Sequence, residues 1–277
     1  MKPPELPPVN VRLLATALKA FLAEELRASR LSGYVVGLSG GLDSAVAAAL
    51  AVAAVGRDRL TALALPGPTS DPASLRDAQA VADALGVGLK TIAITAPADA
   101  FSEVLGAHDD RVRFGNLHAR LRMAALFDRA RADNALVLGT SNKSEILLGY
   151  STLFGDAAAS VQPLGDVWKT HVFALARALR VPEQVITKPP TADLWPGQTD
   201  AGELGFEYRE VDPVLHCHHE QGMTRAQLLA VGFPQQLVDG ALAAYRKNRF
   251  KWRPTVVARV SASCINVDRI LPRNPEP

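Results

Sequence analysis

Cysteine is scarce in this sequence. The 277 residues contain two cysteines, Cys217 and Cys264, which lie far apart along the chain. Two isolated cysteines form neither the disulfide framework of a small secreted domain nor the Cys-x-x-Cys pair of a zinc or redox site. The sequence therefore favours a reducing compartment, and we expect a cytoplasmic protein.

Long apolar segments and clusters of one charge are also missing. The sequence has no run of about 18 apolar residues without charges, so we expect no membrane-spanning helix. The stretch MKPPELPPVN has no basic segment followed by an apolar one, and we expect no signal peptide. The formal net charge is +2 and no long basic run occurs. We therefore expect neither a membrane nor a nucleic acid as partner.

The rest of the composition, 48% hydrophobic and 21% charged, is typical of a globular protein. Short β-branched runs alternate with longer segments of helical periodicity. We expect strands at 33–39, 60–66, 89–95 and 135–140, and helices at 9–30, 43–55, 71–86, 110–132 and 167–180. This alternation predicts an α/β fold, a parallel sheet with helices on both faces, followed by a helical C-terminal part. We interpret residues 1–277 as one domain, with an N-terminal helix (1–32), a core (33–207) and a helical tail (208–277).

The segment SGGLDS (39–44) lies between the first expected strand and the next helix. Gly40 and Gly41 allow a tight turn, free N–H groups at the helix start favour an anion, and Ser39 and Ser44 add hydroxyl donors. The pattern fits neither the Walker loop nor the Gly-x-Gly-x-x-Gly dinucleotide loop. Asp43 would repel bound phosphates unless a cation lay between them. The segment therefore predicts a phosphate site that uses Mg²⁺.

SGGLDS resembles the pyrophosphate loop of the ATP pyrophosphatases, which split ATP between its α and β phosphates. The resemblance implies a Rossmann-like core over residues 33–207. It does not choose among the members of this superfamily.

Three segments further along the chain carry residues typical of a nucleotide site. In the segment VLGTSNKSEILLGYSTLFGD (137–156), an expected strand ends at Thr140 and Glu145 follows about one turn later. Glu145 could join Asp43 as a ligand of Mg²⁺. Lys169 lies in the first turn of a helix, where a cation is unfavourable with the dipole, so we expect an anion nearby. The proline-rich segment 188–205 is a candidate lid.

These segments, with GNLHARLRM (115–123) and FKWRP (250–254), resemble NAD synthetase of the ammonia-dependent type in order and spacing, from about residue 10 to residue 255. The resemblance implies a homodimeric ligase that amidates deamido-NAD (nicotinic acid adenine dinucleotide) to NAD, the last step of NAD biosynthesis. ATP would activate the acid as an acyl-adenylate, with release of pyrophosphate and then AMP. Since about 30 residues precede the first expected strand, we expect no glutaminase domain and free ammonia as the nitrogen donor.

The resemblance also implies roles for individual residues. Asp43 and Glu145 would hold Mg²⁺, Asp156 and Lys169 would act in catalysis, and Arg120, Asp156 and Lys251 would contact deamido-NAD. The residues implied for ATP are Ser39, Gly40, Gly41, Asp43, Ser44, Leu65, Thr140, Lys169 and Thr191.

The chain departs from the family pattern at Ala157, Ser160, Ala201 and Phe250, mostly in the half expected to bind the dinucleotide. Two alternatives therefore stay open. Beside an NAD synthetase, these alternatives are a related ATP pyrophosphatase acting on another substrate, and a paralogue that binds a nucleotide without making NAD.

Overall fold

The computed structural model describes residues 2–107, 109–195, 197–252 and 255–264. Its strands are β1 (Gly33–Gly37), β2 (Leu60–Ala64), β3 (Leu89–Thr91) and β4 (Ala135–Val137). The first half of the chain carries the helices α1 (Val11–Ser29), α2 (Leu42–Val55), α3 (Pro72–Leu85), α4 (Thr95–Leu105) and α5 (Arg111–Ala132). The second half carries α6 (Lys143–Leu148), α7 (Lys169–Ala178), α8 (Glu183–Thr187), α9 (Asp200–Leu204), α10 (Tyr208–Leu215), α11 (Arg225–Ala230) and α12 (Gln235–Lys247).

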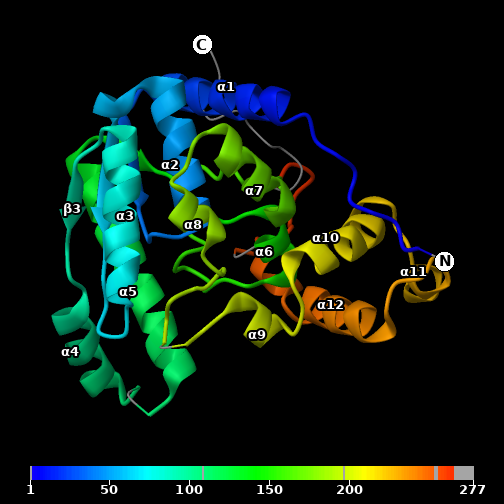
Figure 1. Cartoon of the computed structure of the whole chain (residues 1–277). Helices are drawn as coiled ribbons and strands as arrows, with labels where there is room; N and C mark the ends of the chain where they lie inside the picture. The colour runs from blue at the N-terminus through cyan, green and yellow to red at the C-terminus, as the bar shows by residue number, and fades with distance from the viewer. Residues whose placement is uncertain (1, 108, 196, 253–254, 265–277) are drawn as a thin grey trace.

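The described strands form a parallel sheet in the order β3-β2-β1-β4. The chain moves outward from β1 to β3 and then returns past β1 to β4. Because crossovers between parallel strands are right-handed, this reversal puts α2 and α3 on one face of the sheet and α5 on the other. The predicted α/β fold with helices on both faces is confirmed (Figure 1).

Alternate residues of β1 point to the two faces, as the pleat requires. Tyr34 and Val36 join the core beneath α1, α2 and α7, whereas Val35 joins a smaller cluster beneath α5. The alanine-rich sequence of α2 lets this helix pack between the sheet and its neighbouring helices, and residues Ala45 to Leu50 are at most 5% exposed.

The helices α10, α11 and α12 gather beside the sheet, at the right of Figure 1. They form a hydrophobic cluster with Leu147 and Leu148 of α6 and with Trp168. The helical C-terminal part therefore packs against the segment that follows β4.

The third strand is shorter than its sequence indicated. It ends at Thr91, and Thr95–Leu105 forms α4. Of the β-branched residues in 89–95, Thr91 ends the strand, Ile92 and Ile94 lie in the connection, and Thr95 begins the helix, which periodicity alone did not distinguish. Within the described residues, no helix has the length and apolar character needed to span a bilayer.

Candidate active site

The phosphate-loop segment follows β1 and opens α2. Gly40 has φ 78°, and a Cβ at this position would lie 2.2 Å from the carbonyl oxygen of Ser74. Only glycine therefore fits both the conformation and the space. The Oγ atoms of Ser39 and Ser44 lie 3.1 Å apart, and Ser44 Oγ donates to the carbonyl oxygen of Gly41 at 3.0 Å. These contacts hold the loop at the amino end of a helix of 14 residues.

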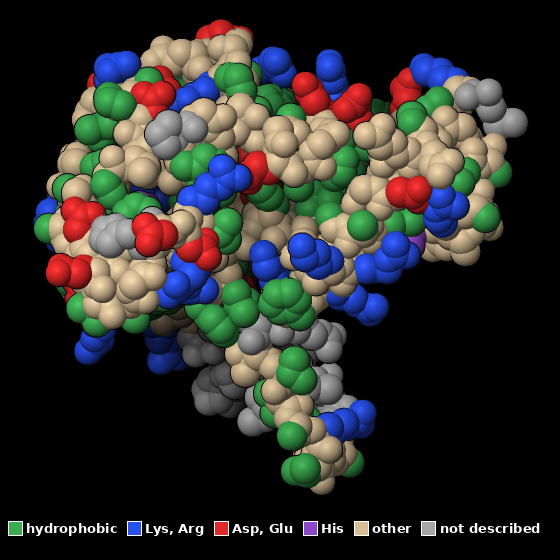
Figure 2. Space-filling model, turned by 90° about the horizontal axis from the view of Figure 1, so that it is seen from below, with side chains coloured by type: hydrophobic (Ala, Val, Ile, Leu, Met, Phe, Trp, Pro, Cys, Tyr) green, Lys and Arg blue, Asp and Glu red, His purple; other side chains and the backbone are tan. Residues whose placement is uncertain are grey.

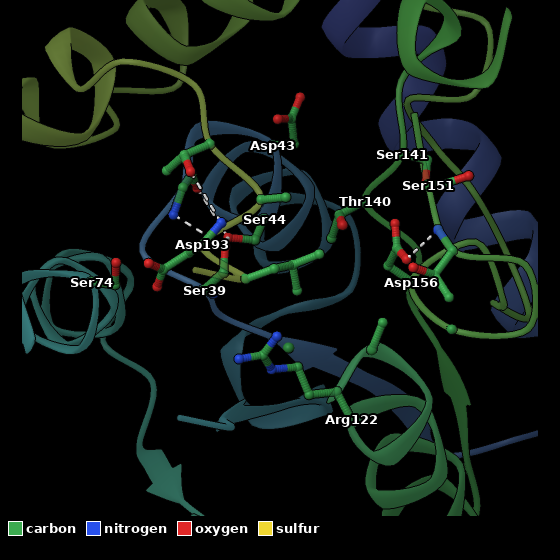
Figure 3. Close-up of a pocket in the computed structure, with 18 of the residues that line it drawn as sticks. Ser39, Asp43, Ser44, Ser74, Arg122, Thr140, Ser141, Ser151, Asp156 and Asp193 are labelled. Atoms are coloured by element: carbon green, nitrogen blue, oxygen red, sulfur yellow. Dashed lines mark hydrogen bonds between the residues drawn. The ribbon is translucent and has the colours of Figure 1, made fainter. Parts of the chain in front are cut away.

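A cleft of about 640 Å³ opens beyond the carboxyl ends of the strands. Figure 3 shows Ser39, Ser44 and Thr140 around it, with Arg122 reaching in from α5 and Asp156 on another side. The face seen in Figure 2 carries Lys and Arg side chains around its middle. The predicted site residues that line this cleft are Ser39, Gly41, Asp43, Ser44, Leu65, Thr140, Glu145, Asp156, Lys169, Thr191 and Lys251.

Two predicted site residues do not line the cleft. Gly40 faces Ser74 rather than the cleft, and its positive φ allows the loop to turn there. Arg120 is exposed on α5, and it is Arg122, two positions later, that lines the cleft. The expected contact between Arg120 and the dinucleotide stays a prediction.

Asp43, Glu145 and Lys169 meet at one point of the cleft. Lys169 Nζ lies 3.1 Å from Glu145 Oε1 and also contacts Asp43 Oδ2, while Asn142 Nδ2 donates to Asp43 Oδ1 at 3.0 Å. Lys169 is 2% exposed. Burial by itself lowers the pKa of Lys169, but the charges of Asp43 and Glu145 outweigh it and raise that pKa. Lys169 is therefore a cation held between two carboxylates.

This geometry suits a hard divalent cation. The oxygens of Asp43 and Glu145 converge on a single cationic atom, Lys169 Nζ, so they are close enough to share a metal ion. Among the described residues, no group of three His, Cys, Asp or Glu side chains could hold a metal alone. Two carboxylates with ligand phosphates and water is a usual arrangement for Mg²⁺.

Asp212 lies on the side of this cluster away from the cleft, and sequence analysis did not identify it as a site residue. It is fully buried and accepts hydrogen bonds from Ser144 Oγ (2.6 Å), Thr170 N (2.9 Å) and Thr170 Oγ1 (2.7 Å). Ser144 Oγ in turn accepts from Lys169 N at 2.9 Å. Asp212 thus caps the start of α7 and joins α10 to the backbone of Lys169.

The candidate lid is tied to α3 and to the segment before it. Lys188 Nζ donates to Asp77 Oδ2 at 2.9 Å and to Ser74 Oγ at 3.1 Å. Thr69 Oγ1 donates to the carbonyl oxygen of Leu194 at 2.9 Å. These tethers place residues 188–195 along the cleft wall, including Thr191.

Asp156 lies on a turn at the far side of the cleft. Its Oδ1 accepts from Thr152 N at 2.8 Å. Lys251 Nζ donates to the carbonyl oxygens of Gly149 and Ser151, both at 2.7 Å, and so braces the same turn. Desolvation by the surrounding protein raises the pKa of Asp156, although its side chain reaches the solvent of the open cleft.

Arg122 forms the floor of the cleft near the end of β2. It donates to the carbonyl oxygen of Leu65 at 3.0 Å and to Ser70 Oγ at 3.1 Å. It therefore fixes the backbone at Leu65, one of the residues that the resemblance assigns to ATP.

His118 lies one turn before Arg122, and it is fully buried. Neither of its ring nitrogens has a hydrogen-bond partner in the described part of the chain. Burial, reinforced by the positive charge of Arg122, lowers the pKa of His118 to about 4. The imidazole is therefore neutral in the folded protein at pH 7.

We expect His118 to make the fold sensitive to acid. Below about pH 6.5 the unfolded chain binds a proton at this residue, whereas the folded chain does so only near pH 4. Stability should therefore fall as the pH falls through this window, by about 3 kcal/mol in total. His118→Leu removes the titrating group. From pH 7 to pH 4, the free energy of urea unfolding should therefore fall less in the variant than in the wild-type protein. Parallel stability curves for the two proteins would contradict this account.

The positions that depart from the family pattern lie outside the described cleft lining. Ser160 accepts a hydrogen bond from Val137 N at 3.1 Å, so its hydroxyl is engaged with the backbone of β4. Phe250 is 63% exposed. Ala157, Ser160, Ala201 and Phe250 are absent from the cleft wall.

Comparison with known proteins identifies the family of this chain. The family model described as NAD synthase matches residues 14–255. A curated NH(3)-dependent NAD(+) synthetase of Chlorobium phaeobacteroides (strain DSM 266) is 44% identical over 91% of this chain and 90% of its own length. A protein of the same name from Fusobacterium nucleatum is 41% identical, over 91% of this chain and 97% of its own.

Two solved structures have a similar fold. An NMN synthetase from Francisella tularensis superposes with a TM-score of 0.80 at 32% identity, over 92% of this chain and all of its own. An NH3-dependent NAD synthetase from Campylobacter jejuni gives a TM-score of 0.78 at 31% identity, over 91% of this chain and all of its own. With the family model covering most of its length, the chain belongs to the NAD synthase family.

Proposed function

We propose that this protein is an ammonia-dependent NAD synthetase, a ligase that forms the amide of NAD from deamido-NAD, ammonia and ATP. The observation that carries the proposal is the meeting of Asp43, Glu145 and Lys169 beside the SGGLDS loop in one cleft. The curated relatives of this length and similarity bear that name.

The loop and its neighbours would bind ATP. Backbone N–H groups at the start of α2, with Ser39 and Ser44, donate to phosphate oxygens, and Lys169 adds a positive charge once a phosphate is near. Leu65, Thr140 and Thr191 also line the cleft and would contact ATP. Mg²⁺, held by Asp43 and Glu145, would neutralise phosphate charge when bound.

The reaction then needs positioning more than a protein nucleophile. The carboxylate of the acid attacks the α-phosphate of ATP, pyrophosphate leaves, and an acyl-adenylate remains. Ammonia attacks the acyl carbon, the bond to AMP breaks, and the nitrogen loses a proton. Asp156 would position the ammonia or accept this proton, and Lys251 and Arg120 would contact the acid. Residues 188–195 along the cleft wall would keep water from the adenylate.

The decisive assay follows purified protein with ATP, Mg²⁺, ammonium and deamido-NAD, measuring NAD and AMP together. We expect equal amounts of both, and glutamine should not replace ammonium. AMP without NAD would indicate another acceptor. Neither product, from folded protein that binds ATP, would indicate a nucleotide-binding paralogue.

A second candidate substrate is the acid of the mononucleotide, nicotinic acid mononucleotide. The observation that favours it is the TM-score of 0.80 with the NMN synthetase of Francisella tularensis. The ratio of kcat/KM for the two acids, measured in the same assay, decides between them.

We also propose a cytoplasmic homodimer. The chain has two cysteines far apart in sequence, and the thiol of Cys217 is free, as expected in a reducing compartment. Apolar side chains of α4, Phe101 at 53%, Val104 at 83% and Leu105 at 54% exposure, offer a surface for a second copy. Light scattering during size-exclusion chromatography would show twice the chain mass, and the monomer mass would contradict it.

A further inference from the structure

Arg122 is a cation of the cleft that the proposed function leaves without a role. Its Nε donates to the carbonyl oxygen of Leu65 at 3.0 Å, and its Nη2 donates to Ser70 Oγ at 3.1 Å. The remaining terminal nitrogen, Nη1, donates to no residue in the described part of the chain. Nη1 is not buried either, since none of the buried polar atoms without a partner belongs to Arg122. Because Arg122 lines the cleft, Nη1 is an available donor at the cleft surface.

The guanidinium of Arg122 also lacks a counter-ion in contact with it. Both of its acceptors are neutral oxygens, and no carboxylate of the described residues forms an ion pair with it. Burial lowers the pKa of Arg122, and the charges of Asp193 and Asp156 offset this only in part. Asp193 Oδ1 accepts instead from Asp71 N at 3.3 Å. Asp156 Oδ1 accepts from Thr152 N at 2.8 Å. A partly buried cation without an ion-pair partner favours an anionic ligand.

The lysines of the cleft lining differ from Arg122 in this respect. Lys169 is held between two carboxylates, and Lys188 is paired with Asp77. Lys251 donates to two carbonyl oxygens on the far side of the cleft. Among the described basic residues that line the cleft, Arg122 is therefore the one that has neither a carboxylate partner nor a place on the far side.

Arg122 lies on the side of the cleft where the phosphate loop lies. It is anchored to Leu65 just beyond β2, and β2 pairs with β1, the strand that leads into SGGLDS. Figure 3 shows its guanidinium reaching from α5 toward the side of Ser39. An anion bound by Arg122 would therefore be a neighbour of the phosphates that the loop is proposed to hold.

The α-phosphate of ATP meets this description. The loop would hold the two phosphates that leave as pyrophosphate, and the α-phosphate links them to the nucleoside. A guanidinium suits phosphate oxygens because its N–H groups form a planar fork. The α-phosphate also carries the negative charge that shifts during attack, so a fixed positive donor favours the reaction there. The carboxylate of the acid is the other anion of the reaction, and Lys251, proposed to contact it, lies on the far side.

We infer that Arg122 Nη1 binds an oxygen of the α-phosphate of ATP, the phosphate that AMP retains. The identity of this anion rests on the proposed function, whereas the unpaired donor rests on the geometry alone. Arg122 would hold the phosphorus atom that the carboxylate attacks, and it would keep its contact with the AMP group after pyrophosphate has left. Its bonds to Leu65 and Ser70 fix the direction of the guanidinium before the nucleotide arrives.

Arg122→Gln tests the contact by titration calorimetry with two ligands, AMP and adenosine. We expect the Kd of AMP to rise about tenfold or more, because a charge-assisted hydrogen bond is lost, and the Kd of adenosine to stay within about twofold of wild type. Equal weakening of both ligands would show that Arg122 acts only by fixing Leu65 and Ser70, and would overturn the inference. An unchanged Kd of AMP would overturn it too. Arg131→Gln is the matched control, since Arg131 is exposed on the same helix, and it should bind both ligands as wild type does.

A structural measurement on the wild-type protein does not depend on how the variant folds. Crystals grown with AMP should place a phosphate oxygen within about 3.2 Å of Arg122 Nη1. AMP bound in this way by a protein that makes no NAD would leave the contact standing and refute the proposed function. NAD synthesis by a protein whose bound AMP keeps its phosphate away from Arg122 would refute the contact alone. The same holds if Arg122 contacts the carboxylate of bound deamido-NAD instead.

Discussion

Asp43→Asn should lower turnover by about a thousandfold, or ~4 kcal/mol in the activation barrier. The amide keeps the shape of the side chain but removes one of the two carboxylates proposed to hold Mg²⁺ beside the phosphates. The fold should survive, because Lys169 keeps Glu145 as a partner at 3.1 Å. Removing one of several crowded carboxylates also relieves repulsion. The measurement is kcat at saturating Mg²⁺, together with the midpoint of urea unfolding.

Asp58→Asn is the control for this substitution. The side chain of Asp58 is 97% exposed, and its contact with Arg57 is 3.9 Å long. We expect wild-type turnover from this variant. If D43N kept more than about a tenth of wild-type kcat, the assignment of Asp43 to the metal would be wrong.

Asp212→Ala should have the largest effect on stability, about 3–4 kcal/mol. It removes three hydrogen bonds from a fully buried site and leaves Thr170 N at the start of α7 without its acceptor. Stabilities of single domains are about 5–15 kcal/mol, so this is a large fraction of the total. The free energy of urea unfolding measures this loss. The value for Asp212→Asn should lie between those of D212A and wild type, because its amide oxygen can still accept a hydrogen bond.

Asp239→Ala is the comparison for D212A. Asp239 forms a surface ion pair with Arg225, and the two side chains are 43% and 47% exposed. Such pairs contribute about 0–1 kcal/mol. Equal losses of stability in D212A and D239A would show that Asp212 does not support the site as argued.

The sequence was most informative where function restricts a short segment. SGGLDS predicted a tight turn between β1 and α2, and the structure has this turn, with Gly40 at positive φ just before the helix. The alternation of strands and helices predicted the parallel sheet. The predicted end of β3 was wrong, because residues 92–95 are apolar or β-branched and fit either a strand or the segment that leads into α4.

Contacts between distant segments could not be predicted. Lys169 reaches Asp43 across 126 positions, and Asp212 reaches Ser144 across 68. The sequence also could not tell which arginine of GNLHARLRM enters the cleft. The start of α5 packs against more than one neighbour, so its apolar pattern does not define a single buried face, and Arg122 rather than Arg120 points inward.

The strand order has a consequence for how the chain is made. Strand β1 can pair with β2 soon after both leave the ribosome. Its other edge pairs with β4, where Gly33 lies opposite Ala135, and that strand is made much later. Contacts between residues so far apart form slowly, because loop-closure entropy is lost before the contact is gained. During that interval β1 presents an open edge, rich in valine, to other nascent chains. The central strand that leads into SGGLDS therefore stays open to edge-to-edge association until the segment that carries β4 has been made.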